Sequence, residues 1–194
     1  MDTLTPRPHV RIRGDSDISG VRAPACPRKG ELPMRVDWAK WSLILLCLAM
    51  AGAIGGGLYE HLVLQPLWSA SPPASFSVIQ PGTGVPLQIF WIPVHTAITV
   101  FVILSLILTW RQPRVRHLLL IGLTSYIIMR AWSAFYFIPE MLAFQKAPID
   151  SPPSPELSAR VANWTSRTWW REPLDIITYV SFLLALYQHR RSEG

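Results

Sequence analysis

Four apolar blocks separated by polar stretches dominate the pattern of this chain. The blocks are Trp41–Tyr59, Phe90–Trp110, Leu118–Ile138 and a shorter, weaker Leu174–Tyr187. A helix rises about 1.5 Å per residue, so about 20 residues are needed to cross a hydrocarbon layer of about 30 Å. The first three blocks meet this length, and the fourth reaches it if Trp169–Pro173 lies in the interfacial zone. The pattern therefore predicts an all-α polytopic membrane protein, an up-down bundle of four transmembrane helices.

The predicted boundaries follow from the same blocks. The four spans are expected at about 40–60, 89–110, 117–138 and 172–188, within a membrane domain of residues 37–189. Residues 1–36 are rich in Pro, Gly, Arg and Asp and lack periodicity, so they are expected to form a disordered cytoplasmic tail. Residues 190–194 form a second, short tail. We also expect Pro66 to begin an outer loop, Pro139 to end the third span, and residues 156–170 to form a short helix at the membrane surface.

The net charge of +6 matters less than where the positive charges lie. Basic residues precede the first block, fill the gap between the second and third, and follow the fourth; they are Arg7, Arg11, Arg13, Arg22, Arg28, Lys29, Arg35, Lys40, Arg111, Arg114, Arg116, Arg190 and Arg191. With four crossings these groups fall on one side, and the positive-inside rule places both termini in the cytoplasm. The pattern is typical of a multi-pass protein of the bacterial inner (plasma) membrane. The tail lacks interleaved aromatic residues, so no nucleic-acid partner is expected.

Arg130 is the only charged residue inside the third block. A charge at such a depth is costly in lipid, so it is expected to face protein or water. Counting about 1.5 Å per residue places Arg130 about 18 Å, His95 about 22 Å and Glu60 about 26–28 Å above the inner boundary. Helical side chains lean toward the N-terminus of their helix, which favours a partner for Arg130 inside the bundle. The sequence thus predicts that Glu60, His95 and Arg130 surround an outward-facing pocket.

These three residues fit a catalytic arrangement in which His95 or Glu60 is a general base and Arg130 holds a phenolate or enolate oxygen. Tyr59, Tyr126 and Tyr179 are candidate walls or hydroxyl donors for a bound molecule. A purely structural salt bridge that fixes the register of the helices remains an alternative. No His, Glu or Cys spacing matches a strong metal-binding motif, so no metal ligands are assigned, and the cofactor is left unknown.

Small residues in the first span predict close helix packing. Gly52 and Gly56 are four residues apart, as are Ala49, Ala53 and Gly57. Such spacing lets transmembrane helix backbones approach each other closely.

Three short motifs carry a family resemblance. They are Gly-Gly-Gly-Leu-Tyr-Glu-His (55–61), Pro-Leu-Trp-Ser (66–69) and Asn-Trp-Thr-Ser-Arg (163–167). Over roughly residues 40–188 the chain resembles the four-span anthrone-oxygenase-like membrane proteins, many of which are bacterial domains of unknown function. The resemblance implies a four-helix membrane bundle and, for the fungal members, oxygenation of a polycyclic phenolic anthrone without a well-defined cofactor. It also implies site roles for Glu60, His61, Asn163 and Arg167.

Two functional hypotheses follow. The first is an integral membrane protein of unknown substrate with an outward-facing polar cluster, which binds or passes a ligand. The alternative is a membrane-embedded oxygenase or related enzyme that acts on an aromatic or phenolic small molecule. The expected partners are the lipid bilayer and an apolar or aromatic small molecule, and a homo-oligomer is left open. A channel within one subunit is not favoured, because the inner halves of the spans carry no polar stripe.

Overall fold

The computed structural model describes residues 36–192, and all regular structure within this range is helical. The prediction of an all-α protein is confirmed for the described residues. Apart from Val36, the predicted N-terminal tail lies outside them, as do residues 193–194 of the C-terminal tail.

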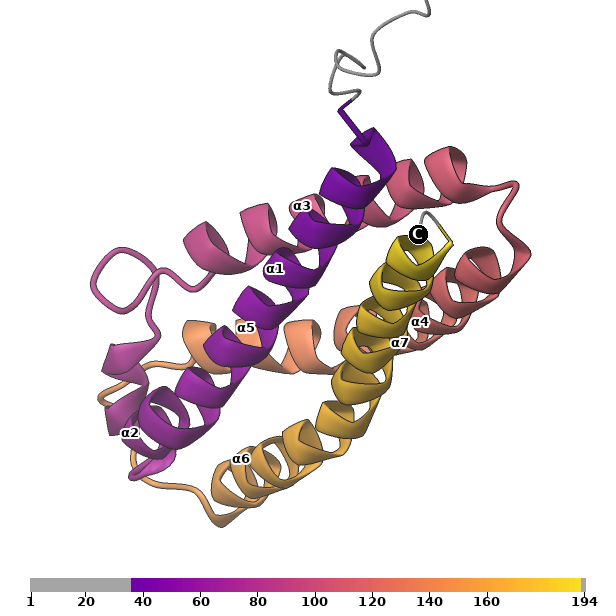
Figure 1. The fold of residues 1–194 in the computed structure, drawn as a ribbon. Helices are drawn as coiled ribbons and strands as arrows, with labels where there is room; N and C mark the ends of the chain where they lie inside the picture. The colour runs from indigo at the N-terminus through magenta and orange to yellow at the C-terminus, as the bar shows by residue number, and fades with distance from the viewer. Residues whose placement is uncertain (1–35, 193–194) are drawn as a thin grey trace, which may run out of the picture. The chain divides into compact units, whose positions relative to one another are not determined.

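Four long helical rods make up the domain that begins at Asp37 (Figure 1). The first rod consists of α1 (Trp38–Tyr59), the π-helical turn η1 (Glu60–Leu64) and α2 (Gln65–Ser69), and the second is α3 (Gln88–Thr109). The third consists of α4 (Pro113–Trp132), the π-helical turn η3 (Ser133–Phe137) and α5 (Ile138–Lys146). The fourth consists of α6 (Pro155–Thr168), the 3₁₀ turn η4 (Trp169–Arg171) and α7 (Glu172–Arg191). A 3₁₀ turn, η2 (Ala74–Val78), lies in the loop before α3.

Three helices in the described part of the chain are long and apolar enough to cross a membrane. They are Trp38–Ser69, Gln88–Thr109 and Pro113–Lys146. α7 is 20 residues long, but its first turn carries Glu172 and Asp175 and its last turn carries His189, Arg190 and Arg191. By length and composition the chain is therefore suited to a membrane, with three clear candidate spans.

Two prolines that were expected to end helices do not end them. The first rod continues through Pro66 to Ser69, and the third continues through Pro139 to Lys146. Each proline lies two residues after a π-helical turn, in the first turn of the next α-segment. Proline lacks an N–H and crowds the preceding turn, and a wider turn just before it relieves both problems. The expectation that the helices stop at these prolines was wrong for that reason.

The first of two hydrophobic clusters, which we call the core bundle, is built by α1, α3, α4 and α7. Its fully buried side chains are mostly aliphatic and include Leu43, Leu46, Met50, Ile98, Val102, Leu119, Phe182 and Ala185. Hydroxyl groups join neighbouring helices through it. Ser42 Oγ lies 2.8 Å from Ser105 Oγ between α1 and α3, and Ser125 Oγ donates to the Leu174 carbonyl at 2.9 Å between α4 and α7. Such interhelical hydrogen bonds and small residues are typical of packing in lipid.

Two glycines in the helices of the core bundle lie tightly against a ring, Gly122 on α4 and Gly56 on α1. A Cβ at Gly122 would lie 2.5 Å from the Phe182 ring, whereas nothing lies within 4 Å of one built at Gly52 or Gly55. Gly56 does approach the Phe90 ring of α3. The predicted close packing on α1 is therefore present at Gly56 and absent at Gly52.

The second cluster, which we call the aromatic cap, covers the far ends of the rods. It contains Trp68, Phe76, Ile79, Phe137, Phe144, Val161 and Trp164, all at most 4% exposed. Its rings stack or meet edge to face, with centroids 5.2 Å apart for Trp68 and Trp164 and 5.5 Å apart for Phe76 and Phe144. The segments α2, η2, α5 and α6 supply most of these side chains, so the cap lies beyond the π-helical turns.

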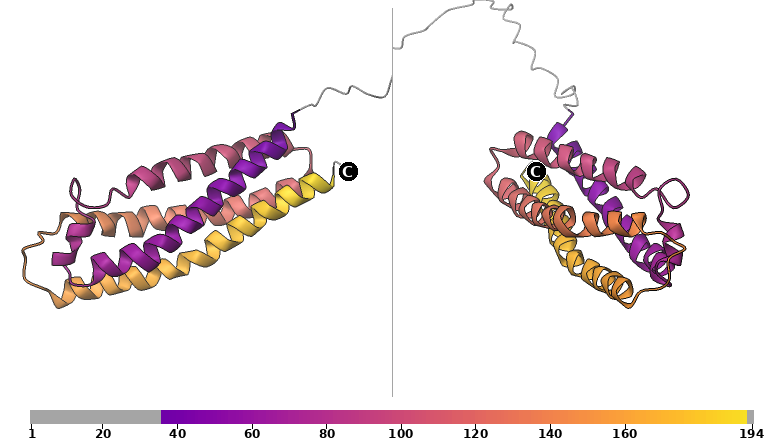
Figure 2. Two further views of the ribbon diagram at one scale, coloured as in Figure 1. Left: turned by 60° about the vertical axis from the view of Figure 1, so that its left-hand side comes forward. Right: turned by 180° about the vertical axis from the view of Figure 1, so that it is seen from behind.

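A helix forms in the predicted surface segment, as α6. It continues into α7 through a single 3₁₀ turn and runs on in the direction of α7 (Figure 2). A helix lying along a membrane surface would instead cross the direction of the spanning helix that follows it. One face of α6 is covered by the aromatic cap through Val161 and Trp164.

Candidate functional site

Three of the four rods depart from regular α-helical winding at the boundary between the core bundle and the aromatic cap. The departures are the π-helical turns η1 and η3 and the 3₁₀ turn η4. Side-chain contacts place them at one level: His61 of η1 contacts Glu172 directly after η4, and Arg171 of η4 contacts Ser133 of η3. Single π-helical turns inside α-helices are frequent at functional sites. We call this level the junction.

His61 fixes α1 against α7 at the junction. Its side chain is buried, its Nε2 donates to Glu172 Oε1 at 2.9 Å, and its Nδ1 lies 2.8 Å from Gln65 Oε1. The ring stacks on Trp169 with centroids 4.6 Å apart. Both ring nitrogens face oxygen atoms, an arrangement that a protonated imidazole satisfies.

Arg171 reaches from η4 to the third rod. Its Nη1 donates to Ser133 Oγ at 3.1 Å, and its guanidinium carbon lies 4.4 Å from the centroid of the Phe137 ring. Its Nε is buried and makes no hydrogen bond within the described residues. Burial lowers the pKa of the Arg171 guanidinium, and the nearby charge of Glu60 opposes this shift. Arg171 is thus a largely buried cation with donor capacity to spare.

A chain of ring contacts connects Glu60 to Tyr126. Trp91 Nε1 donates to Glu60 Oε2 at 3.0 Å, and the Trp91 ring stacks on His95 with centroids 5.4 Å apart. His95 Nδ1 pairs with the buried Tyr126 hydroxyl at 3.0 Å. The structure therefore brings Glu60 to the N–H edge of the Trp91 indole ring and His95 to a face of the same ring.

Arg130 is half-buried on α4 and makes no ion pair or hydrogen bond with another described side chain or carbonyl. Its charge acts on His95 and on Asp175 of α7. The arginine whose charge acts on Glu60 is Arg171. Of the three predicted catalytic residues, Glu60 and His95 thus share Trp91, and Arg130 lies on the His95 side without a direct partner.

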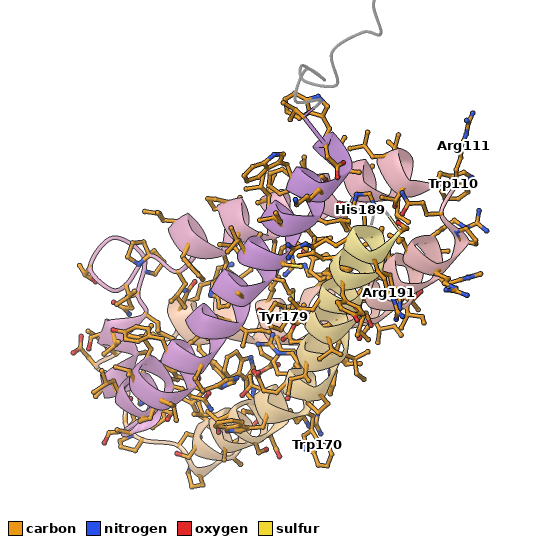
Figure 3. The ribbon with its side chains drawn as sticks, in the orientation of Figure 1. Trp110, Arg111, Trp170, Tyr179, His189 and Arg191 are labelled. Atoms are coloured by element: carbon orange, nitrogen blue, oxygen red, sulfur yellow. The ribbon has the colours of Figure 1, made fainter. Side chains whose placement is uncertain are left out.

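The other candidates lie in different parts of the molecule. His61 is buried in the junction, and Tyr126 is buried in the core bundle, where its hydroxyl pairs with His95. Tyr59 is 56% exposed, and Asn163 and Arg167 are exposed on α6, where the Arg167 guanidinium lies over the Tyr136 ring at 5.1 Å. Tyr179 lies on α7 and packs against the core bundle rather than the junction (Figure 3).

Sequence reasoning assigned no site role to Trp91, Arg171 or Glu172, which connect the junction. Trp91 carries no signal, because a tryptophan near a helix start usually marks the membrane interface. The adjacent charges Arg171 and Glu172, at the start of a weakly apolar span, were a usable signal. Their pairing with Ser133 and His61 could not be read from spacing, because it joins different rods.

No group of three or more His, Cys, Asp or Glu side chains within residues 36–192 is placed to hold a metal ion. The chain matches no protein-family model, no curated protein and no solved structure. The resemblance to the anthrone-oxygenase-like proteins therefore stays a prediction.

Proposed function

We propose that this chain is a four-span inner-membrane protein with both termini in the cytoplasm. Besides the three candidate spans, α7 supports this topology, because Phe182 and Ala185 are fully buried in the core bundle. No charged residue lies between Asp175 and His189. The arginines of the α3–α4 turn lie at the same end as the end of α7, since His189 contacts Gln112. The positive-inside rule makes this end cytoplasmic.

The lengths of the rods support a position of the junction at the outer edge of the membrane. The first and third rods have 32 and 34 residues, so each extends about 50 Å, well beyond a hydrocarbon layer of about 30 Å. Glu60 lies about 33 Å along the first rod. The aromatic cap then projects outward, and the junction lies where lipid chains give way to headgroups.

The function that the junction supports best is binding of a small apolar molecule that carries a phenolic or enolic oxygen. The observation that carries this proposal is the departure of three rods from α-helical winding at the level where their charged side chains converge. Regular helices with apolar contacts would suffice to hold a bundle together. A buried donor without an acceptor costs about 1–3 kcal/mol, and an oxyanion would satisfy the Arg171 Nε. The half-buried Arg130 would add a second charged donor.

A second candidate is an enzyme acting on such a molecule, including the oxygenase that the resemblance implies. The observation that favours it is the pairing of His95 with Tyr126, because an imidazole next to a phenol can accept and pass on a proton. In an anthrone, His95 would take the proton from the carbon opposite the carbonyl. Arg130 would stabilise the oxygen of the resulting enolate.

Binding of 1-naphthol and naphthalene tests the first candidate, because the two rings differ only in the oxygen. Quenching of tryptophan fluorescence in detergent-purified protein would report both. We expect 1-naphthol to bind at least about tenfold more tightly, and Arg130→Gln to remove that preference, since a charge-assisted hydrogen bond is worth about 1.5–3 kcal/mol. Arg167→Gln, which removes an exposed arginine on α6, is the matched control and should retain it. Equal affinity of the wild-type protein for both compounds would contradict the proposal.

Exchange of the acidic anthrone hydrogen for deuterium tests the second candidate. We expect the wild-type protein to accelerate this exchange in D₂O, measured by mass spectrometry of the recovered anthrone. His95→Gln should bind 1-naphthol normally and lose the acceleration. If the wild-type protein binds 1-naphthol but does not accelerate exchange, the enzyme candidate is wrong and the binding candidate stands.

A further inference from the structure

The other end of the core bundle holds a second site, which the proposed function does not use. A cavity of about 560 Å³ lies between the α3–α4 turn and the end of α7. It is lined by Arg111, Gln112, Pro113, Arg114, Val115, Gln188, Arg191 and Ser192. Figure 3 labels Trp110 and Arg111 near the α3–α4 turn and His189 and Arg191 near the end of α7. We call this cavity the arginine pocket.

The arginine pocket carries an unbalanced positive charge. Arg111, Arg114 and Arg191 line it, and among residues 36–192 no carboxylate does. All three arginines are exposed, and none forms an ion pair or a hydrogen bond with another described residue. The neighbouring Arg116, by contrast, donates to the Trp110 carbonyl at 3.3 Å and lies over the Trp110 ring at 5.0 Å. The three lining guanidiniums therefore keep their full donor capacity for a ligand.

The floor of the pocket is built from buried and hydrogen-bonded side chains. Val115 is 2% exposed, and Gln112 Oε1 lies 3.0 Å from Nδ1 of the buried His189, whose Nε2 donates to Asp37 at 3.0 Å. Gln112 is also the N-cap of α4, and its side chain makes no capping bond. The free amides of the first turn of α4 and the positive end of its dipole add to the arginine charge, a combination that favours a phosphate group.

Tryptophans place this pocket at the level of lipid headgroups. Trp38 and Trp110 are more than half exposed. Trp110 directly precedes Arg111 of the pocket, and Trp38 directly follows Asp37, the partner of His189. Exposed tryptophans of membrane helices concentrate at the interface between hydrocarbon and water. A phosphate group is the anion present in quantity at that height.

From these observations we infer that the arginine pocket binds a phosphate ester, with the headgroup of an anionic phospholipid as its source. Arginine binds phosphate oxygens through two parallel hydrogen bonds, so a pocket lined by three unpaired arginines suits this group. Basic pockets between helices on the cytoplasmic side are known to hold such headgroups. The inference rests on the proposed topology, which makes this end of the bundle cytoplasmic, and it does not depend on ligand binding at the junction.

Native mass spectrometry of the full-length, detergent-purified chain tests this inference with defined lipids. The probes are dioleoyl phosphatidylglycerol, dioleoyl phosphatidylcholine and inorganic phosphate. The variant Arg111→Gln/Arg114→Gln/Arg191→Gln empties the pocket of charge. The control Lys146→Gln/Arg160→Gln/Arg167→Gln removes the same charge from the other end of the molecule. A third variant, Arg111→Lys/Arg114→Lys/Arg191→Lys, keeps the charge and removes the paired donors.

We expect one phosphatidylglycerol to bind the wild-type protein and the control alike. The glutamine variant should bind it at least about tenfold more weakly, and the lysine variant should fall between them. If the glutamine variant does not fold, the weaker binding of the lysine variant carries the test. Displacement of the lipid by millimolar inorganic phosphate would support the phosphate site and assign it to a soluble ester. Equal binding of phosphatidylcholine, equal loss in the control, or unchanged binding in both pocket variants would overturn the inference.

Discussion

The core bundle and the aromatic cap solve the same packing problem in different ways. The core bundle uses mostly aliphatic side chains, regular α-helices and a few hydroxyl groups that bridge neighbouring helices. The aromatic cap uses large rings from short segments, among them Trp68, Phe76 and Trp164. Rings bury more area per residue than aliphatic side chains, which suits a small cluster with few residues to spare.

The junction lies between these two differently packed regions and holds the charged side chains that neither of them buries. Neither region buries a group of charges in its centre, whereas the junction brings Glu60, His61, Arg171 and Glu172 together from two rods. Packing in the core bundle and in the aromatic cap holds the fold on both sides of these charges. The junction can therefore carry two π-helical turns and a buried, unpaired donor without loss of the fold.

The largest expected effect separates the two regions directly. Trp164→Ala should destabilise the protein by about 3–5 kcal/mol, because it leaves a cavity in the aromatic cap and removes the hydrogen bond from Trp164 Nε1 to the Phe137 carbonyl. Hydrogen exchange should increase in α2, α5 and α6 while α1 and α4 stay protected. Trp170→Ala, at a site 71% exposed, is the control and should change little. Uniform loss of protection would mean that cap and core unfold as one unit.

An intermediate effect is expected inside the core bundle. Gly122→Ala should cost about 1–3 kcal/mol, because its Cβ would meet the fully buried Phe182 ring, which has no room to move. Thermal unfolding in detergent would measure the change. Gly52→Ala places the same methyl group in open space and should be neutral or slightly stabilising, since alanine favours a helix. A loss at Gly52 as large as that at Gly122 would refute the packing described here.

The smallest expected effect compares the two ends of the α1–α7 contact. His61 lies between Gln65 and Glu172 at the junction, and His189 lies between Gln112 and Asp37 at the other end. His61→Ala and His189→Ala should each cost about 1–2 kcal/mol through lost hydrogen bonds. The two sites are about 30 Å apart, so the double variant should lose the sum, as chemical denaturation would measure. Only His61→Ala should weaken 1-naphthol binding. An equal effect of His189→Ala would mean that the junction is not the binding site.

Much of the fold could be predicted from periodicity and block length. The apolar blocks mark α1, α3 and α4 to within a few residues of their observed starts, because an apolar run of about 20 residues leaves little choice but a helix in lipid. The ends were predicted less well. In the sequence, Pro66 and Pro139 are expected to end helices. In the structure, a π-helical turn before each proline lets the helix continue, and such turns have no sequence signature of their own.

The site was predicted in part, for a related reason. Glu60 and His95 could be grouped because helix rise gives the height of each residue in the membrane. Height does not give rotation about the helix axis, and rotation decides that Glu60 meets Trp91 and the charge of Arg171 rather than Arg130. Tyr59 and Tyr126 illustrate the same limit, since one is exposed and the other is buried against His95.

What this sequence determined by itself is the helical class, the candidate spans and the clustering of charge near their ends, because these depend on the composition of contiguous segments. Only the tertiary structure decided which side chains meet. His61 with Glu172 and Arg171 with Ser133 are contacts between residues far apart in the chain. Their geometry depends on the rotation and winding of several helices at once, and those are set by packing across the core bundle and the aromatic cap.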